Sequence, residues 1–244
     1  ALADGGDAIA IGGNRDGAAG MQTIASGPST TAVGGQAQAM GPGATAYGWR
    51  AEASAERATA LGHLATAQGV RSVAIGENAD AQTDNATAIG NESIANGIDA
   101  LAVGDTAMAS GTSTTAVGGE SIAMNPGSSA FGWQAEATGE RSTAVGHLAT
   151  AQGLRSVAIG ENADAQTDNA TAIGNESIAN GIDALAVGDT AMASGNLTTA
   201  VGGESIAMNP GSSAFGWQAE ATGERSTAVG HLSEASGFAS TSMG

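Results

Sequence analysis

Cysteine is absent from the 244 residues, which excludes disulfide bonds, thiolate metal sites and cysteine nucleophiles. Basic residues are scarce, because 7 Lys plus Arg stand against 24 Asp plus Glu, a formal net charge of −17. Such a chain repels phosphate backbones and anionic lipid headgroups, so we expect no nucleic-acid or membrane-surface binding. No apolar run approaches the roughly 20 residues of a membrane span, so we expect no direct membrane insertion by these residues.

Large apolar side chains are also scarce. Aromatic residues make up 3% of the chain, and the 41% counted as hydrophobic is largely alanine, alongside 39 glycines. Alanine buries little area, so a single globular core built from it would be weak. The glycines nevertheless follow a strict period, which a disordered Gly-rich chain does not need.

That period is fourteen residues, and it runs from Gly20 to Gly244 without a slip. The sequence Ser-Val-Ala-Ile-Gly ends on two of these glycines, at 72–76 and at 156–160. A fixed period of this kind is the signature of a stacked repeat architecture. A further copy, Ala8-Ile9-Ala10-Ile11-Gly12, is out of phase with Gly20, so we expect a register break near 13–19.

A longer period of 84 residues lies on top of the first, and it equals six coils. Residues 59–111 match 143–195 with two differences. We therefore expect one continuous domain with four parts: irregular N-terminal coils over 1–28, two super-repeats over 29–112 and 113–196, and a truncated third over 197–244.

Each coil divides into two halves with alternating side chains. Ser72, Ala74 and Gly76 alternate with Val73 and Ile75, and a second alternation follows after Gly76. Period two predicts strands, so each coil holds a first and a second short strand, and the coils stack as a parallel β-solenoid. The uniformly small set, Ala, Ser, Gly and Thr, is expected to face the interior of a narrow roll.

On the outward side of the first strand, the residue just before each ladder glycine is apolar in every coil. Monomeric soluble proteins rarely expose so long an apolar stripe, and a closed cyclic oligomer would bury one stripe per subunit. We expect the oligomer interface to hold Val33, Tyr47, Leu61, Val73, Ile75, Ile89, Leu101, Val103, Val117, Phe131, Val145, Val157, Ile159, Ile173, Leu185, Val187, Val201, Phe215 and Val229.

The fourteen-residue ladder carrying Ser72–Gly76 and Ser156–Gly160 closely resembles the YadA-like head of trimeric autotransporter adhesins, over nearly the entire chain. The resemblance implies a left-handed parallel β-roll that assembles as a homotrimer on a bacterial cell surface. We expect the chain to be a piece of a longer protein, held in the outer membrane by regions outside it.

Family heads of this kind imply attachment to host extracellular matrix or a cell-surface receptor. The sequence departs from the collagen-binding pattern, because Arg71 and Arg155 stand where that pattern has asparagine, and Ala79 and Ala163 where it has serine. We expect a polyvalent mechanism, in which three copies of each repeated surface turn weak contacts into avidity.

Two sets of side chains invite other interpretations. An expected Trp/His column, with imidazole stacked on indole near the interface, contains Trp49, His63, Trp133, His147, Trp217 and His231. A three-fold histidine ring holding an anion or a metal is the alternative. The candidate ligand-facing cations are Arg57, Arg71, Arg141, Arg155 and Arg225, which could equally form exposed ion pairs with neighbouring glutamates.

Rival functions fit the pattern less well. An ice-binding solenoid would use the outward column Thr31, Thr45, Thr59, but Val73 and Leu101 interrupt its continuation. A purely structural spacer is the other alternative. No enzyme or cofactor is expected, because fourteen residues per coil is not a multiple of the six-residue strands of hexapeptide-repeat acyltransferases. No metal is expected, because the acidic residues lack the nine-residue period of calcium-binding β-rolls.

Overall fold

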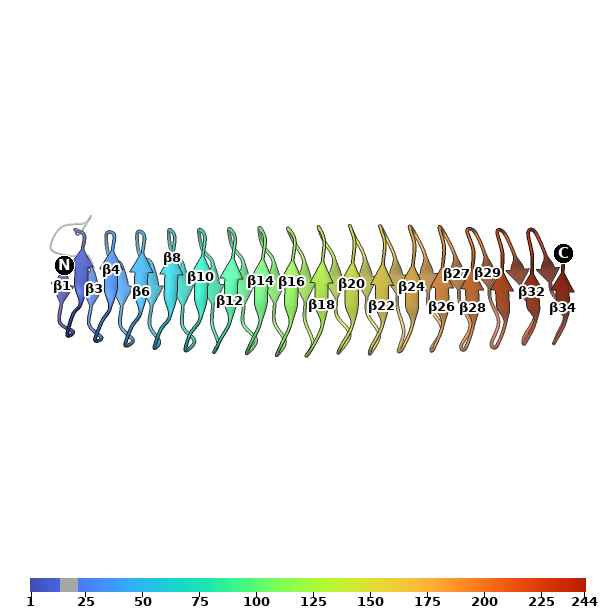
Figure 1. The fold of residues 1–244 in the computed structure, drawn as a ribbon, viewed down its shortest axis with the longest axis horizontal. Helices are drawn as coiled ribbons and strands as arrows, with labels where there is room; N and C mark the ends of the chain where they lie inside the picture. The colour runs from blue at the N-terminus through green and yellow to red at the C-terminus, as the bar shows by residue number, and fades with distance from the viewer. Residues whose placement is uncertain (14–21) are drawn as a thin grey trace. The chain divides into compact units, whose positions relative to one another are not determined.

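Strands are the only regular elements in the computed structural model, which describes residues 1–13 and 22–244 (Figure 1). No helix within these ranges is long and apolar enough to cross a membrane. The chain divides into two compact units, Ala1–Ser121 and Ile122–Gly244, and each is a stack of two-stranded coils. This architecture confirms the expected all-β parallel solenoid.

The first unit alternates three-residue and two-residue strands, which are the first and second strands of the coils. Its first strands are β2 (Ile9–Ile11), β4 (Thr31–Val33), β6 (Thr45–Tyr47), β8 (Thr59–Leu61), β10 (Val73–Ile75), β12 (Thr87–Ile89), β14 (Leu101–Val103) and β16 (Thr115–Val117). Its second strands are β1 (Leu2–Ala3), β3 (Ile24–Ala25), β5 (Gln38–Ala39), β7 (Glu52–Ala53), β9 (Thr66–Ala67), β11 (Asp80–Ala81), β13 (Ile94–Ala95) and β15 (Met108–Ala109).

The second unit repeats the pattern. Its first strands are β18 (Ser129–Phe131), β20 (Thr143–Val145), β22 (Val157–Ile159), β24 (Thr171–Ile173), β26 (Leu185–Val187), β28 (Thr199–Val201), β30 (Ser213–Phe215), β32 (Thr227–Val229) and β34 (Thr241–Met243). Its second strands are β17 (Ile122–Ala123), β19 (Glu136–Ala137), β21 (Thr150–Ala151), β23 (Asp164–Ala165), β25 (Ile178–Ala179), β27 (Met192–Ala193), β29 (Ile206–Ala207), β31 (Glu220–Ala221) and β33 (Glu234–Ala235).

Strand pairing is parallel and shifts by one coil per step. Within the first unit, β10 pairs with β8 and β12, so Ile75 lies between Leu61 and Ile89. Second strands pair in the same way, with Asp80 opposite Thr66 and Ile94. The fourteen-residue period therefore sets the register directly, since each side chain is stacked on its equivalents in the neighbouring coils.

The interior of each roll is lined by small side chains from both strands. Ala74, Ala79 and Ala81 are fully buried, and so is the Ser72 side chain. Alanine contributes little apolar area to this interior. Backbone hydrogen bonds between neighbouring coils therefore hold much of the stack together, and one example is the bond from Val73 N–H to Ala86 C=O, which is 2.9 Å long. The expected assignment of small residues to the interior is confirmed.

The turns explain why the ladder position is glycine. At Gly76, φ is +134°, and a Cβ atom would lie 2.4 Å from the carbonyl oxygen of Gly90 in the next coil. Each turn also holds a left-handed residue, such as Asn78 in the first turn of that coil and Asn85 in the second. Asparagine tolerates this conformation better than most residues do.

The N-terminal coil pairs over a longer interval than the rest. Strand β2 pairs with β4 so that Ile11 lies opposite Val33, and Gly12 is stacked on Gly34. The fourteen-residue period predicts that Gly20 is stacked on Gly34 in the next coil. This prediction is wrong, because Gly12 is the glycine stacked on Gly34. Most of the register break expected near 13–19 lies outside the described residues, as does Gly20.

Candidate functional site

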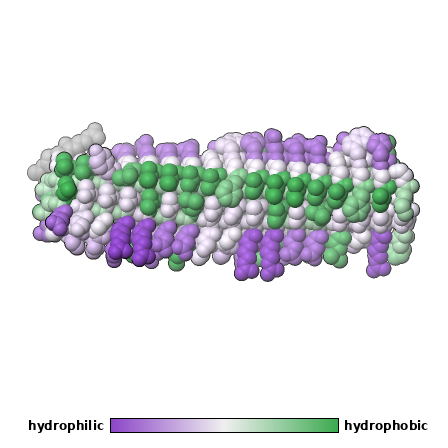
Figure 2. Space-filling view, in the orientation of Figure 1, coloured by the Kyte–Doolittle hydropathy of each residue, from purple (hydrophilic) through white to green (hydrophobic). Residues whose placement is uncertain are grey.

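The first-strand face of each unit carries the expected apolar stripe on its outer side. In β10, Val73 and Ile75 point outward while Ala74 between them is fully buried. The same alternation holds in β14 and β22, which present Leu101 with Val103 and Val157 with Ile159. Figure 2 shows an apolar band over the first strands of each unit.

The members of this stripe are partly covered by their neighbours in the stack and remain accessible. Tyr47 is 57% exposed, and Phe131 and Phe215 are each 40% exposed. The positions Val33, Leu61, Val117, Val145, Val187 and Val201 are half-buried. Leu185, Ile173, Ile89 and Val229 complete the set, on β26, β24, β12 and β32. An apolar face of this kind favours burial against another surface.

The Trp/His pairs lie in the first turns, directly after ladder glycines. The ring centroids of Trp49 and His63 are 4.8 Å apart, with an interplanar angle of 14°. Trp133 stacks on His147 at 4.9 Å, and Trp217 on His231 at 4.8 Å. These pairs confirm the expected stacking of imidazole on indole, because a fourteen-residue separation places two side chains one coil apart.

Two of these histidines also have an acidic neighbour in the next coil. The Nδ1 atom of His63 lies 3.1 Å from Glu77 Oε1, and the equivalent distance from His147 to Glu161 is 3.5 Å. All four side chains are close to half exposed. Within residues 1–13 and 22–244, no group of three or more His, Asp or Glu side chains is placed to hold a metal ion.

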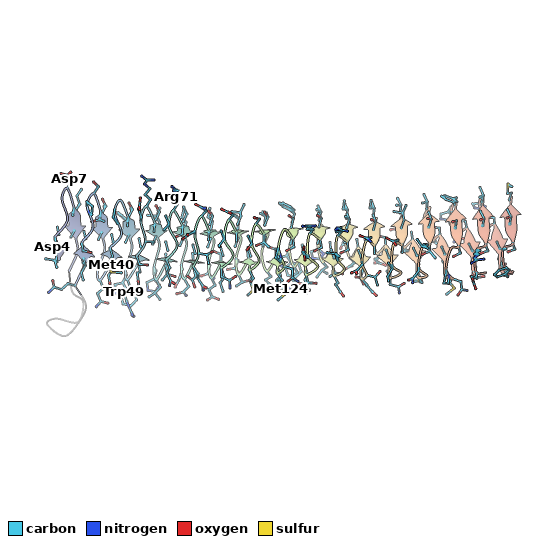
Figure 3. All side chains as sticks on the ribbon, turned by 90° about the horizontal axis from the view of Figure 1, so that it is seen from below. Asp4, Asp7, Met40, Trp49, Arg71 and Met124 are labelled. Atoms are coloured by element: carbon cyan, nitrogen blue, oxygen red, sulfur yellow. The ribbon has the colours of Figure 1, made fainter. Side chains whose placement is uncertain are left out.

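Within each unit, the arginines of the second turns lie at the opposite edge of the coils from the Trp/His pairs of the first turns. Figure 3 shows Arg71 and Trp49 at these two edges of the first unit. Arg57 lies 3.6 Å from Glu56, Arg141 lies 3.7 Å from Glu140, and Arg225 lies 3.9 Å from Glu224. These exposed pairs contribute little to stability, about 0–1 kcal/mol each.

Arg71 and Arg155 differ from the other three arginines of these turns. Both side chains are exposed, and the described part of the chain places no carboxylate within ion-pair distance of either. Their backbones adopt the left-handed conformation, with φ of +59° and +56°. Arg71 and Arg155 are thus the two arginines of this set that face solvent without an ion-pair partner among the described residues.

The polar ladders of the turns were not predicted from the sequence. Asn91 Nδ2 donates to Asp105 at 2.9 Å, and Asn85 Nδ2 donates to Asp99 at the same distance. The His63–Glu77 contact belongs to the same type. The signal that would have found all three is the fourteen-residue offset itself, applied to polar as well as apolar side chains.

Comparison with known families agrees with this geometry. A model described as the YadA head domain repeat (two copies) matches residues 25–51, 41–65, 53–79, 67–93, 95–121, 125–149, 151–177, 179–207 and 209–233. The chain belongs to the YadA head family. It is accordingly an adhesin-like head, and the repeated unit of that family coincides with the coils described above.

Comparisons with individual proteins give less information about this chain than the family model does. Among solved structures, the chain is similar to the crystal structure of the collagen-binding domain of the Yersinia adhesin YadA, with 21% sequence identity and a TM-score of 0.20. That match covers 92% of this chain and 80% of the other. No curated protein matches the chain.

Proposed function

We propose that this chain is the head of a bacterial trimeric autotransporter adhesin, which attaches to host cells or extracellular matrix through many repeated contacts. The observation that carries the proposal is the outward apolar face of the first strands, in a chain built from YadA head repeats. The proposed location is the bacterial cell surface, with anchorage in the outer membrane. No catalytic role is proposed.

A homotrimer accounts for the apolar face because a closed cyclic assembly buries identical stripes without leaving an open edge. Each side chain of the stripe is already half covered, so complete burial contributes about 1 kcal/mol. The first unit holds eight outward residues at the position of Ile75, from Ile11 to Val117, and the total per unit is on the order of 5–10 kcal/mol. That is comparable with the stability of a small domain.

The stacked Trp49–His63 pair and its copies supply a rigid border to this proposed interface. Arg71 and Arg155 lie at the other edge, where a ligand that carries negative charge would meet unpaired cations. Each trimer then presents three copies of every surface, and linked weak sites gain avidity by factors of roughly 10²–10⁴.

Binding of the whole chain to immobilised matrix proteins and glycans tests the adhesin function. We expect retention that falls at least about ten-fold when Ile75→Asp and Ile159→Asp are combined, because charge on the stripe separates the copies and removes avidity. Glu52→Ala, on the second-strand face in β7 and away from the stripe, is the control and should leave retention unchanged. Failure of the intact chain to bind any matrix protein, glycan or host cell would refute the proposal.

A further inference from the structure

The second-strand face of the second unit carries an apolar strip of its own. Ile178, Met192 and Ile206 occupy the outward position in β25, β27 and β29, and the strand register places them one above another. All three are half-buried. Above and below them the same position holds acidic residues, Asp164 in β23 and Glu220 in β31. The strip is therefore a short apolar floor with a carboxylate at each end.

The left-handed residues of the first turns form a wall beside this floor. Two neighbouring hollows share Thr190 and Met192, and their volumes are about 460 and 400 Å³. The first hollow is also lined by Asn162 and Glu176, and the second by Glu204, Gln218 and Leu232. Together they form a groove, called here the acidic groove, which runs along the stack over at least two coil steps.

Local charge is strongly one-sided around the acidic groove. Residues 156–224 contain no Lys, Arg or His and nine carboxylates, of which six lie on the second strands or the first turns that border the groove, while Asp168, Asp183 and Glu224 lie in the second turns at the other edge. Asp164 is already engaged, because it accepts hydrogen bonds from Thr150 and Gln166 at 2.8 and 2.6 Å. Glu204 accepts one from Gln218 at 2.6 Å. For Glu176 and Glu220, the described residues provide no hydrogen-bond or ion-pair partner, so both carboxylates are available to a ligand.

We propose that the acidic groove binds a short extended segment of a partner protein in which Arg or Lys alternates with aliphatic residues. An extended segment that lies along the groove points alternate side chains to opposite sides, so its aliphatic side chains pack on the floor. The intervening Arg or Lys side chains start on the solvent side, and their long stems allow them to bend to the exposed carboxylates of Glu176, beside the floor, and Glu220, at its end. Two coil steps span about 9.6 Å, which accommodates roughly three extended residues. Carboxylates pair with such cations through charge-assisted hydrogen bonds.

The charge distribution argues against a second copy of this chain as the occupant. Its own groove is acidic, and a matching surface with Arg alternating with aliphatic residues does not occur in the sequence. Like charges facing each other across an interface suppress association. The partner chemistry that the groove favours is therefore basic and apolar together.

The inference deepens the proposed function and rests on it in treating the partner as a host ligand. The groove residues also recur 84 positions earlier, since Glu92, Ile94, Thr106 and Met108 repeat Glu176, Ile178, Thr190 and Met192. In the first unit, Ile94 pairs in register with Met108, as Ile178 does with Met192. Each chain thus carries the main part of the groove twice, which suits polyvalent attachment.

Fluorescence anisotropy of a labelled peptide of alternating Arg and Val tests the proposal on the whole chain. We expect saturable binding that E92Q, E176Q and E220Q together weaken about ten-fold. The control removes the same number of charges from the second turns with E56Q, E140Q and E224Q, and should change the dissociation constant less than about two-fold. Met108→Ser with Met192→Ser keeps the charge and should also weaken binding.

Three results would overturn the acidic groove as a docking site. They are no binding of the Arg/Val peptide, equal weakening by the groove and control variants, and equal affinity for an Arg/Gly peptide, which lacks aliphatic groups. Circular dichroism melts of each variant separate lost binding from lost folding. A chain that sediments as a monomer yet binds the peptide would refute the proposed trimer and support the acidic groove as a docking site. A chain that sediments as a trimer yet binds no peptide would support the trimer and refute the docking site.

Discussion

Replacing the ladder glycine Gly76 by alanine should break the stack locally. The Gly76 backbone has φ of +134°, and the added Cβ would lie 2.4 Å from the carbonyl oxygen of Gly90. That oxygen belongs to the backbone of the next coil and has no side-chain freedom with which to withdraw. The coil-to-coil hydrogen bond from Gly90 N–H to Ile75 C=O, 2.8 Å long, lies beside the clash.

Two effects add in this variant. A non-glycine residue in so sparsely populated a conformation costs about 1–3 kcal/mol. Forcing a methyl group into a packed contact costs about 1–3 kcal/mol more, so we expect a loss of roughly 2–6 kcal/mol. Gly43→Ala is the matched control, because φ there is +68° and the nearest atom to a Cβ is the flexible Arg57 Cγ at 3.6 Å. It should cost only about 1–2 kcal/mol.

Native-state hydrogen exchange is the suitable assay, because repeat stacks open locally as well as globally. In Gly76→Ala, the amide of Gly90 should lose protection far more than amides several coils away, and Gly43→Ala should change protection little. Equal and small effects of the two substitutions would refute the steric account of the ladder.

Two further predictions concern the free energy of unfolding, measured by denaturant titration. Ser72→Ala should be neutral or stabilising by up to about 1 kcal/mol, because the buried Ser72 hydroxyl has no hydrogen-bond partner. Ser142→Ala should instead cost about 1 kcal/mol, because that hydroxyl donates to Gly139 C=O at 2.8 Å; the reverse order of the two variants would contradict this reasoning. Thr106→Gly should stabilise by about 1 kcal/mol, because a β-branched residue there holds φ of +51°, and a loss of stability would show that its side chain contributes more than its strain costs.

The period made most of the fold predictable. A fourteen-residue repeat with period-two alternation determines which residues pair, so the opposition of Ile75 to Leu61 and Ile89 follows from counting alone. The small interior follows in the same way, because only Ala, Ser, Gly and Thr fit the positions of Ala74 and its equivalents. Counting failed at the N-terminus, where the Ala8–Gly12 copy of the motif, rather than the spacing from Gly20, determines the pairing.

The candidate sites were harder to predict because each is formed by side chains from several stacked coils and not by the residues of one coil. The outward residue of the second strand is polar in about half of the coils, and Ile178, Met192 and Ile206 become a strip only when three coils are stacked. The His63–Glu77 contact likewise joins residues of adjacent coils, and only the stacking of those coils brings them together. Hydrogen-bond direction and accessible volume require coordinates, and the period does not supply them.

Sedimentation equilibrium of the whole chain tests most directly whether the first-strand face is buried between copies. The expected mass is three times the chain mass of 23.3 kDa, independent of concentration over the micromolar range. Combining Ile75→Asp with Ile159→Asp should return the mass to that of one chain while the strand signal in circular dichroism persists. An intact chain that sediments as a folded monomer would contradict the assignment of the apolar face as a trimer interface.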